Sequence, residues 1–499
     1  MKRTDRQDEK FIASQNSRRF AWFTQKGGGG VFIIDGKPQT KYQIVFPDSV
    51  RFSQDSTNLV YSVKKNDKQL VIINGKEGPV FDEIAPLSML FSPDSKHLAY
   101  AARIDQKWSI ILDGRVCQLH DEIGAHRWVA EMGYVGKGFQ PTFQQNITNW
   151  TMKFSPDSNQ FAYLVRDGDL WAFVLDQAVH QSYEIINPEY FVFSPDSNHF
   201  VYKVEHRGKS FLVVDGEEQE KYDLLLYGSP VFSPDSKRLG YFAQRNGIWF
   251  AVIDGIENQV SGTPVKRSIK FSPDSKHVAY ATWINDQEWY WKVDGIKHNI
   301  YKAFGLATFS PDSKSFIYTG IKRNRGYLVI DGQTGKSNFS RVGPFRLSPD
   351  GEHLAYTATV KSWGKDRKHM VLDGIRGDAY DSILGQALFS PDSQHIAYRA
   401  KKEKKWLVVV DEEPGKRYQS VFGLTFSPDS NHLAYVGKQG NKDVLVVDHR
   451  ELNRHEKIYA SNTEYVKTIG SIIFDTPTQL HYLAQDKGEI SLHEINLVS

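Results

Sequence analysis

Apolar and polar residues alternate along this chain in short blocks, without a long amphipathic stretch. In one example an apolar run ends at Phe232, and Ser233-Pro234-Asp235-Ser236 follows it as a polar turn. Residues 238–243 and 248–253 are two further apolar blocks, rich in β-branched and aromatic residues and separated by a polar tip. Asp254-Gly255 then marks a tight turn before a more polar block. The pattern predicts four short antiparallel strands, A to D.

The block F-S-P-D-S-x-x-h-A-Y, in which h is apolar, recurs at a spacing near 39 residues. Its copies begin at Phe91, Phe154, Phe193, Phe232, Phe271, Phe309, Leu347, Phe389 and Phe426, with weaker copies at Ala13, Phe52 and Phe474. A fixed period of this length means that one small unit is repeated, so a residue present in every copy serves the fold. Four strands in such a unit make one propeller blade. The sequence therefore predicts an all-β protein, a β-propeller of twelve four-stranded blades.

The S-P-D-S/G turn, followed by an apolar-Val-Asp-Gly turn, resembles the WD40-like repeat of TolB-type propellers. That repeat also builds the propellers of prolyl oligopeptidases and tricorn-type proteases. The resemblance covers roughly residues 11–499. The G-H and W-D pairs of true WD40 repeats do not occur in these copies, nor does the N-terminal α/β domain of TolB. The resemblance implies the fold and says little about function.

Single propellers usually have four to eight blades, so twelve copies favour two six-bladed rings. One twelve-bladed ring is the alternative, and it would leave a wide, unfilled channel. Consecutive rings would divide the chain into residues 1–260 and 261–499. Alternatively, copies four to nine, about residues 151–385, form one ring nested within a split ring of copies one to three and ten to twelve. The last copy lacks a fourth strand. Residues 2–8 could supply it by pairing with residues 489–497, which would otherwise expose a sheet edge.

Histidines near the turn aspartates are the first candidates for chemistry. Six copies place one three residues after the aspartate: His97, His199, His277, His353, His395 and His432. A Ser-His-Asp triad or a metal site could use these residue types. Other copies, however, have Arg19, Asn58, Gln160 or Arg238 at this position. We therefore interpret the histidines as polar residues that open strand B and the aspartates as turn formers.

No catalytic or cofactor motif accompanies these residues. G-x-S-x-G, phosphate-binding glycine motifs and C-x-x-C pairs are absent from the sequence. We therefore expect no enzyme activity and no cofactor. An enzyme or small-ligand-binding protein with its site in a propeller channel is the alternative, because loops at a channel mouth could assemble a site that spacing does not reveal.

Composition indicates in which cellular compartment the protein is expected. The chain has 499 residues, a net charge of +3 and one cysteine, Cys117, which fits a reducing compartment. There is no run of 18 apolar residues, and the first residues lack the apolar region of a secretory signal. The expectation is a soluble, cytoplasmic protein without a membrane span.

The tips between strands B and C carry the most uneven charge. Those of copies eight, nine and ten each have a net charge of +3. Their residues are Lys322, Arg323 and Arg325; Lys361, Trp363, Lys365, Arg367 and Lys368; and Lys401, Lys402, Lys404 and Lys405. Because consecutive blades are neighbours, these tips predict one basic surface for a partner, most simply an acidic protein. Nucleic acid is a less favoured partner because no binding motif is present, and ordinary solvated hairpin tips are the alternative.

One interval between copies is 63 residues long, and its extra residues lie at about 124–150. We expect this insertion to be a D–A loop on the same face as the basic tips, with Trp128, Tyr134 and Phe139 as anchors for a partner. Packing between rings and covering a ligand are the alternatives. The sequence thus predicts a non-catalytic interaction or scaffold module. An accessory or noncatalytic homologue of a TolB-type or peptidase propeller is the second possibility.

Overall fold

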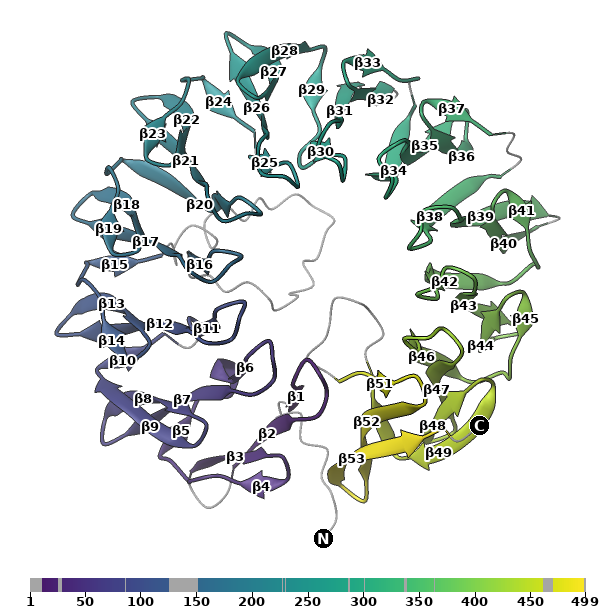
Figure 1. Ribbon diagram of the computed structural model, residues 1–499, viewed down its shortest axis with the longest axis horizontal. Helices are drawn as coiled ribbons and strands as arrows, with labels where there is room; N and C mark the ends of the chain where they lie inside the picture. The colour runs from purple at the N-terminus through teal and green to yellow at the C-terminus, as the bar shows by residue number, and fades with distance from the viewer. Residues whose placement is uncertain are drawn as a thin grey trace. The chain divides into compact units, whose positions relative to one another are not determined.

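The structure is a computed structural model that describes residues 11–25, 29–85, 87–124, 151–226, 228, 230–285, 288–299, 301–335, 339–362, 364–460 and 470–497. Within these ranges the only helix is one turn of 3-10 helix, η1 (Pro47–Ser49). No helix of the described chain is long and apolar enough to cross a membrane. All other regular structure is antiparallel sheet, in twelve separate sheets (Figure 1). The predicted all-β class and the twelve propeller blades are confirmed.

Each sheet follows the repeat, with strand B between strands A and C. The B strands are β2 (Phe20–Gln25), β7 (Leu59–Lys65), β12 (Leu98–Ile104), β17 (Phe161–Asp167), β21 (Phe200–His206), β26 (Leu239–Arg245), β31 (Val278–Asn285), β35 (Phe316–Lys322), β39 (Leu354–Ser362), β43 (Ile396–Lys402), β47 (Leu433–Gln439) and β52 (Gln479–Asp486). The C strands are β3 (Gly30–Ile34), β8 (Lys68–Ile73), β13 (Lys107–Leu112), β18 (Leu170–Leu175), β22 (Lys209–Val214), β27 (Ile248–Ile253), β32 (Glu288–Val293), β36 (Arg325–Ile330), β40 (Lys365–Leu372), β44 (Lys405–Val410), β48 (Lys442–Val447) and β53 (Glu489–Asn496).

The D strands are mostly two residues long, which keeps the outer edge of each sheet short. They are β4 (Lys37–Pro38), β9 (Lys76–Phe81), β14 (Arg115–Val116), β19 (Ala178–Val179), β23 (Glu217–Glu218), β28 (Ile256–Val260), β33 (Ile296–Lys297), β37 (Gln333–Thr334), β41 (Ile375–Arg376), β45 (Glu413–Pro414) and β49 (Arg450–His455). In several blades the chain after strand D returns to strand C through a tyrosine, as in the bridge between Tyr222 and Ser210.

The A strands are either continuous or broken into two halves that both pair with strand B. Continuous ones are β1 (Phe11–Ala13), β20 (Ile185–Phe193), β34 (Ala303–Phe309), β38 (Arg341–Leu347), β42 (Ser382–Phe389) and β46 (Ser420–Phe426). The halves of the broken ones are β5 (Ile44–Val45) and β6 (Arg51–Phe52), β10 (Glu83–Ile84) and β11 (Leu90–Phe91), β15 (Glu122–Ile123) and β16 (Met152–Phe154), β24 (Leu224–Leu225) and β25 (Val231–Phe232), β29 (Thr263–Pro264) and β30 (Lys270–Phe271), and β50 (Lys457–Tyr459) and β51 (Ile473–Thr476).

This division corrects the expected place of the long insertion. β15 and β16 both pair with β17, so the insertion interrupts strand A of the fourth blade and is not a D–A connection. The reason is that strand A begins six to eight residues before the F-S-P-D-S block in most other copies, at the point where the chain leaves the preceding blade. Residues 125–150 themselves lie outside the described residues.

The core consists of interfaces between consecutive blades. Most B strands are buried along five consecutive residues, as in β17 and β21, because a neighbouring blade covers each of their faces. A side chain such as Phe173 in the fourth blade therefore packs with Phe200 and Tyr202 in the fifth. Continuous apolar strands of this kind explain why the repeat has no simple alternation of apolar and polar residues in strand B.

By their contacts the described residues form two compact units. The first contains those of residues 1–15, 19–230 and 243–246, and the second contains those of residues 16–18, 231–242 and 247–499. The boundary passes through the sixth blade. The division into two rings, consecutive or nested, stays a prediction.

In the second unit, the turn at residues 16–18 packs against the last blade. The backbone N–H of Ser471 donates a 2.8 Å hydrogen bond to Ser17 Oγ. Arg18 forms ion pairs with Asp475 at 3.0 Å and with Glu494 at 2.9 Å. In that blade, β53 has no D-strand partner among the described residues. The segment 2–8, which we expect to fill the position, lies outside them.

Candidate interaction surface

The S-P-D-S turn is closed by its own side chains. Ser233 Oγ donates a 2.6 Å hydrogen bond to Asp235 Oδ1, and the N–H of Arg238 donates to Ser233 Oγ at 3.0 Å. The same serine–aspartate bond recurs in most blades. Because these hydrogen bonds stabilise the ionised carboxylate, they lower the pKa of the turn aspartates. The bond from Ser155 is the largest cause that lowers the pKa of Asp157, to about 2.

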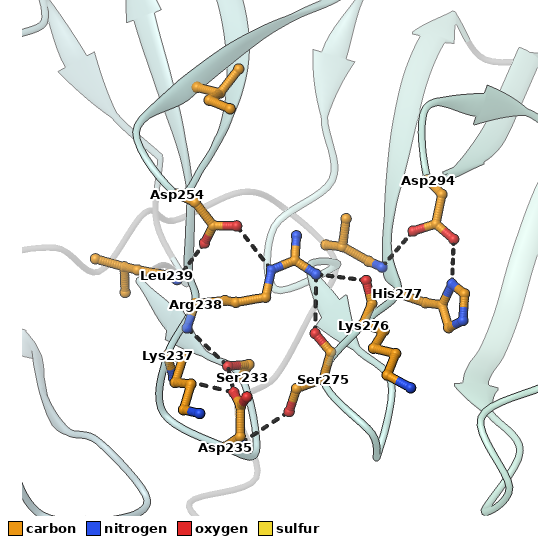
Figure 2. A network of polar contacts seen from close by, with 12 residues as sticks. Ser233, Asp235, Lys237, Arg238, Leu239, Asp254, Ser275, Lys276, His277 and Asp294 are labelled. Carbon is orange, nitrogen blue, oxygen red and sulfur yellow. Dashed lines mark hydrogen bonds and ion pairs between the residues drawn. The ribbon is translucent and has the colours of Figure 1, made fainter.

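The second serine of the turn joins one blade to the next. Ser275 has a φ of 64°, and its hydroxyl accepts a 3.0 Å hydrogen bond from the backbone N–H of Asp235 in the preceding blade (Figure 2). The same link joins Asp55 to Ser95, Asp94 to Ser158, Asp157 to Ser197, Asp274 to Ser313, Asp350 to Ser393 and Asp392 to Ser430. The turn residues thus serve the packing of blades.

The histidines contact the aspartate of the V-D-G turn and not that of S-P-D-S. His277 Nδ1 lies 2.6 Å from Asp294 Oδ2, and Asp294 Oδ1 accepts the N–H of Val278 at 2.8 Å (Figure 2). Equivalent pairs are His97 with Asp113, His199 with Asp215, His353 with Asp373, His395 with Asp411 and His432 with Asp448. Arg238 replaces the histidine in the sixth blade and bonds Asp254. These pairs fasten the start of strand B to the C–D turn.

These turns do not bring the serine, histidine and aspartate of S-P-D-S together as a catalytic triad. The hydroxyl of each first turn serine accepts the backbone N–H of the histidine, while the histidine ring points to another carboxylate, as His97 does with Ser92 and Asp113. Within the described ranges no three His, Cys, Asp or Glu side chains are grouped so as to hold a metal ion.

The basic residues lie on the B–C hairpins of three consecutive blades in the second unit. The hairpins β35–β36 and β43–β44 end in two-residue turns with positive φ, at Arg323 and Asn324 and at Glu403 and Lys404. Such turns match the twist of the strands, so the charges are carried by regular hairpins. Trp363, at the tip of β39–β40, lies outside the described residues.

Two of these hairpins bring like charges directly together. Lys322 is the cross-strand partner of Arg325, and Lys402 is the partner of Lys405. Like charges at directly opposed positions of a sheet repel each other. Among the residues that the structure describes, none of these four side chains forms an ion pair; Lys322 lies 6.0 Å from the ring centre of Tyr301.

Two of the predicted site residues have a structural partner that recurs in other blades. Arg367 pairs with Asp381, which also accepts the N–H of Glu403 in the next blade at 2.8 Å. Lys401 lies over Trp406 at 5.5 Å. The pairs Lys68–Asp82, Lys107–Asp121 and Lys209–Asp223 repeat the first contact, and Arg103–Trp108 and Arg166–Trp171 repeat the second.

The remaining hairpin cations have no ion pair within the described residues: Lys322, Arg323, Arg325, Lys361, Lys365, Lys368, Lys402, Lys404 and Lys405. We call these nine residues the basic patch. Some hairpin cations of the first unit differ, since Lys65 pairs with Glu77 at 2.8 Å, and Arg103 with Glu83 at 3.1 Å. The patch therefore concentrates cations that form no ion pair in the described structure, with Asp366 as the cross-strand partner of Lys361.

Counting charge along the sequence did not reveal the carboxylates, such as Asp381, that pair with hairpin cations. Asp381 follows Tyr380 at the end of the D segment, and the same Tyr-Asp pair occurs at Asp223. That recurrence was the available signal that Arg367 has a partner. Trp128, Tyr134 and Phe139, the expected anchors of the insertion, lie outside the described residues, so their role stays a prediction.

Comparison with known proteins gives no family. No family model matches the chain, and no curated protein matches it. Among solved structures, one described as the crystal structure of the eukaryotic initiation factor is 12% identical, with 72% of this chain and 94% of that chain covered and a TM-score of 0.35. TolB from Acinetobacter baumannii is 15% identical, with 51% and 79% covered and a TM-score of 0.21.

The Dos1 propeller is 11% identical, with 68% of this chain and 90% of that chain covered and a TM-score of 0.29. At these TM-scores the similarities carry no argument about function. Membership of the TolB-like repeat family stays a prediction.

Proposed function

We propose that the protein is a non-catalytic interaction module, and that an acidic protein surface docks on its basic patch. The observation that carries this proposal is the placement of like charges at directly opposed strand positions, Lys322 opposite Arg325 and Lys402 opposite Lys405. Each is unfavourable in the unbound protein. A carboxylate of a partner lying between the two cations would relieve the repulsion, so the favourable contact forms only in the complex.

Charge of this kind acts mainly on recognition and on the rate of association. A concentrated positive surface attracts an acidic partner over several ångströms and repels basic ones. Binding of single-stranded nucleic acid instead combines a basic groove with exposed aromatic rings on which bases stack. No recognised nucleic-acid-binding motif accompanies the patch in the sequence, which favours a protein partner.

Charge reversal on the patch tests the proposal. Lys361, Lys365, Lys402 and Lys404 are changed together to Glu, and the proteins and nucleic acids that co-purify are compared with those of the wild type. A matched control changes four lysines in or directly beside the A–B and C–D turns to Glu: Lys37, Lys96, Lys237 and Lys276. We expect a protein partner to be lost from the first variant and kept by the control.

Three other results contradict the proposal. If the control loses the partner and the patch variant keeps it, the docking face is wrong. If the patch variant keeps every bound molecule, the patch has no role in binding. If it loses nucleic acid but no protein, the class of partner is wrong. Equal melting temperatures of the two variants establish that neither result arises from unfolding.

A further inference from the structure

A groove of 460 Å³ lies between the seventh and eighth blades of the second unit. It is lined by β33 (Ile296–Lys297) and the residues after it, and by the C–D turn of the eighth blade. Asn299 Nδ2 bridges these two sides with a 3.1 Å hydrogen bond to the carbonyl of Gly332. The lining includes the buried rings of Phe309 and Phe316 beside several polar groups. The groove can therefore accept a group with both apolar and polar parts.

The eighth blade departs from the repeat beside this groove. Its residue at the start of strand B is Ser315, where six other blades have histidine. Asp331 Oδ1 accepts the N–H of Phe316 at 2.7 Å, as the repeat requires. The histidine that would occupy Oδ2 is absent, and within the described residues no group donates a hydrogen bond to that oxygen.

The charged neighbours of Asp331 are engaged elsewhere. His277 is held by Asp294 at 2.6 Å, Lys314 pairs with Asp312 at 3.2 Å, and Lys297 lies 4.2 Å from the ring centre of Tyr290. Among the described lining residues, Asp331 and Lys297 are thus the charged groups without an ion pair, and Lys297 is drawn to the ring of Tyr290.

His298 lines the groove with an aromatic ring and does not compensate the charge of Asp331. Its ring stacks on that of Tyr318, with 5.9 Å between ring centres, and packs against Gly332, which has no side chain to displace it. Burial lowers the pKa of His298, so the imidazole is neutral near pH 7. Its Nδ1 is buried without a hydrogen-bond partner in the described structure.

We propose that this groove binds a guanidinium or ammonium group carried on an apolar stem, as in an arginine or lysine side chain of a peptide. The cation would donate to Asp331 Oδ2, and the stem would lie along Phe309 and Phe316. The site is separate from the basic patch and selects ligands of the opposite charge, so it does not depend on the proposed function.

Small amides test the chemistry directly. N-acetyl-arginine amide and N-acetyl-lysine amide are titrated into the wild-type protein and followed by ligand-observed NMR. N-acetyl-citrulline amide has nearly the shape of the arginine compound but no charge. We expect both cations to bind, and citrulline to bind about tenfold more weakly because a charge-assisted hydrogen bond is lost. No binding of either cation, or equal binding of citrulline, would overturn the proposal.

Two variants test the residues. Ser315→His supplies the ring that occupies Asp331 Oδ2 in other blades, and Asp331→Asn removes the charge while keeping an acceptor for Phe316. Each should weaken binding of the arginine compound about tenfold. The matched control is Asn58→His, the same repeat position in the second blade, which should bind as the wild type does.

Unchanged binding by Ser315→His or Asp331→Asn, or equal weakening by Asn58→His, would overturn the assignment. Melting temperatures verify folding. Ser315→His keeps the test decisive if Asp331→Asn fails to fold, because the histidine restores a contact that the repeat already uses.

Discussion

The backbone N–H of Asp235 donates a 3.0 Å hydrogen bond to Ser275 Oγ, 40 residues further along the chain (Figure 2). The contact joins the turn of one blade to the turn of the next. It explains why the repeat has a second serine. The positive φ belongs to the turn itself, because Gly351 at the same position of the ninth blade has a φ of 79° and no hydroxyl.

Ser275→Ala should therefore destabilise the protein by about 1 kcal/mol, because the N–H of Asp235 loses its acceptor. Ser275→Gly loses the same acceptor but tolerates the positive φ, so its cost should be smaller than that of alanine. Urea unfolding midpoints measure both. A midpoint of Ser275→Ala equal to that of the wild type would show that the link does not contribute to stability.

The turn aspartates predict a loss of stability in acid. The pKa of Asp157 in the folded protein, about 2, is below the ordinary value of 3.8. The unfolded chain therefore takes up protons first, so the stabilisation is present above about pH 4 and is lost as the pH falls toward 2. Urea midpoints between pH 7 and pH 2 should fall steeply over that window, and less steeply in Asp157→Asn. An unchanged slope in the variant would contradict this origin.

Arg367 and Lys365 should separate stability from binding. Arg367→Ala breaks the contact with Asp381 and should lower stability by about 0.5 kcal/mol, as for other partly exposed ion pairs. Lys365→Ala removes a patch cation without an ion pair, and should weaken partner binding without changing the melting temperature. Thermal unfolding and affinity measurements on both variants check the difference. The reverse outcome would mean that the structural role of Arg367 and the binding role of Lys365 are wrongly assigned.

The N-terminal segment should support the last blade. β53 has no D-strand partner in the described structure, and Arg18 holds the start of the chain to Asp475 in that blade. Deletion of residues 1–9 should lower the melting temperature, because the edge of β53 loses its partner. Replacement of residues 2–8 by a Gly-Ser segment of equal length is the control for chain length and should also lower it. If the deletion has no effect, the segment does not pair with β53.

The blades could be predicted from sequence because each carries its own signals. The turn at Ser233 to Ser236, the Asp254-Gly255 turn and the apolar blocks between them define strands over a short distance, and most copies repeat them. The position of the insertion was wrong because strand A begins at Glu122, in a polar stretch without a strand signal. Whether the blades form one ring or two depends on small rotations at every junction, which local pattern does not encode.

The candidate surface was predicted only in part. Charge on the hairpins follows from composition, but whether a cation is compensated depends on carboxylates of other strands, as for Arg367 and Asp381. The groove beside Asp331 had a signal, the serine at position 315 where other copies have histidine. That signal has meaning only once the histidine is known to bond the V-D-G aspartate.

The salt dependence of association tests the central claim most directly. The rate constant for binding of the captured partner is measured at several ionic strengths for the wild type, the variant Lys361→Glu, Lys365→Glu, Lys402→Glu and Lys404→Glu, and the turn-lysine control. Since the screening length falls to about 8 Å near physiological ionic strength, association with the wild type and the control should slow steeply as salt rises. The patch variant should associate slowly and respond little to salt. Equal slopes for the patch variant and the wild type would contradict docking on the basic patch.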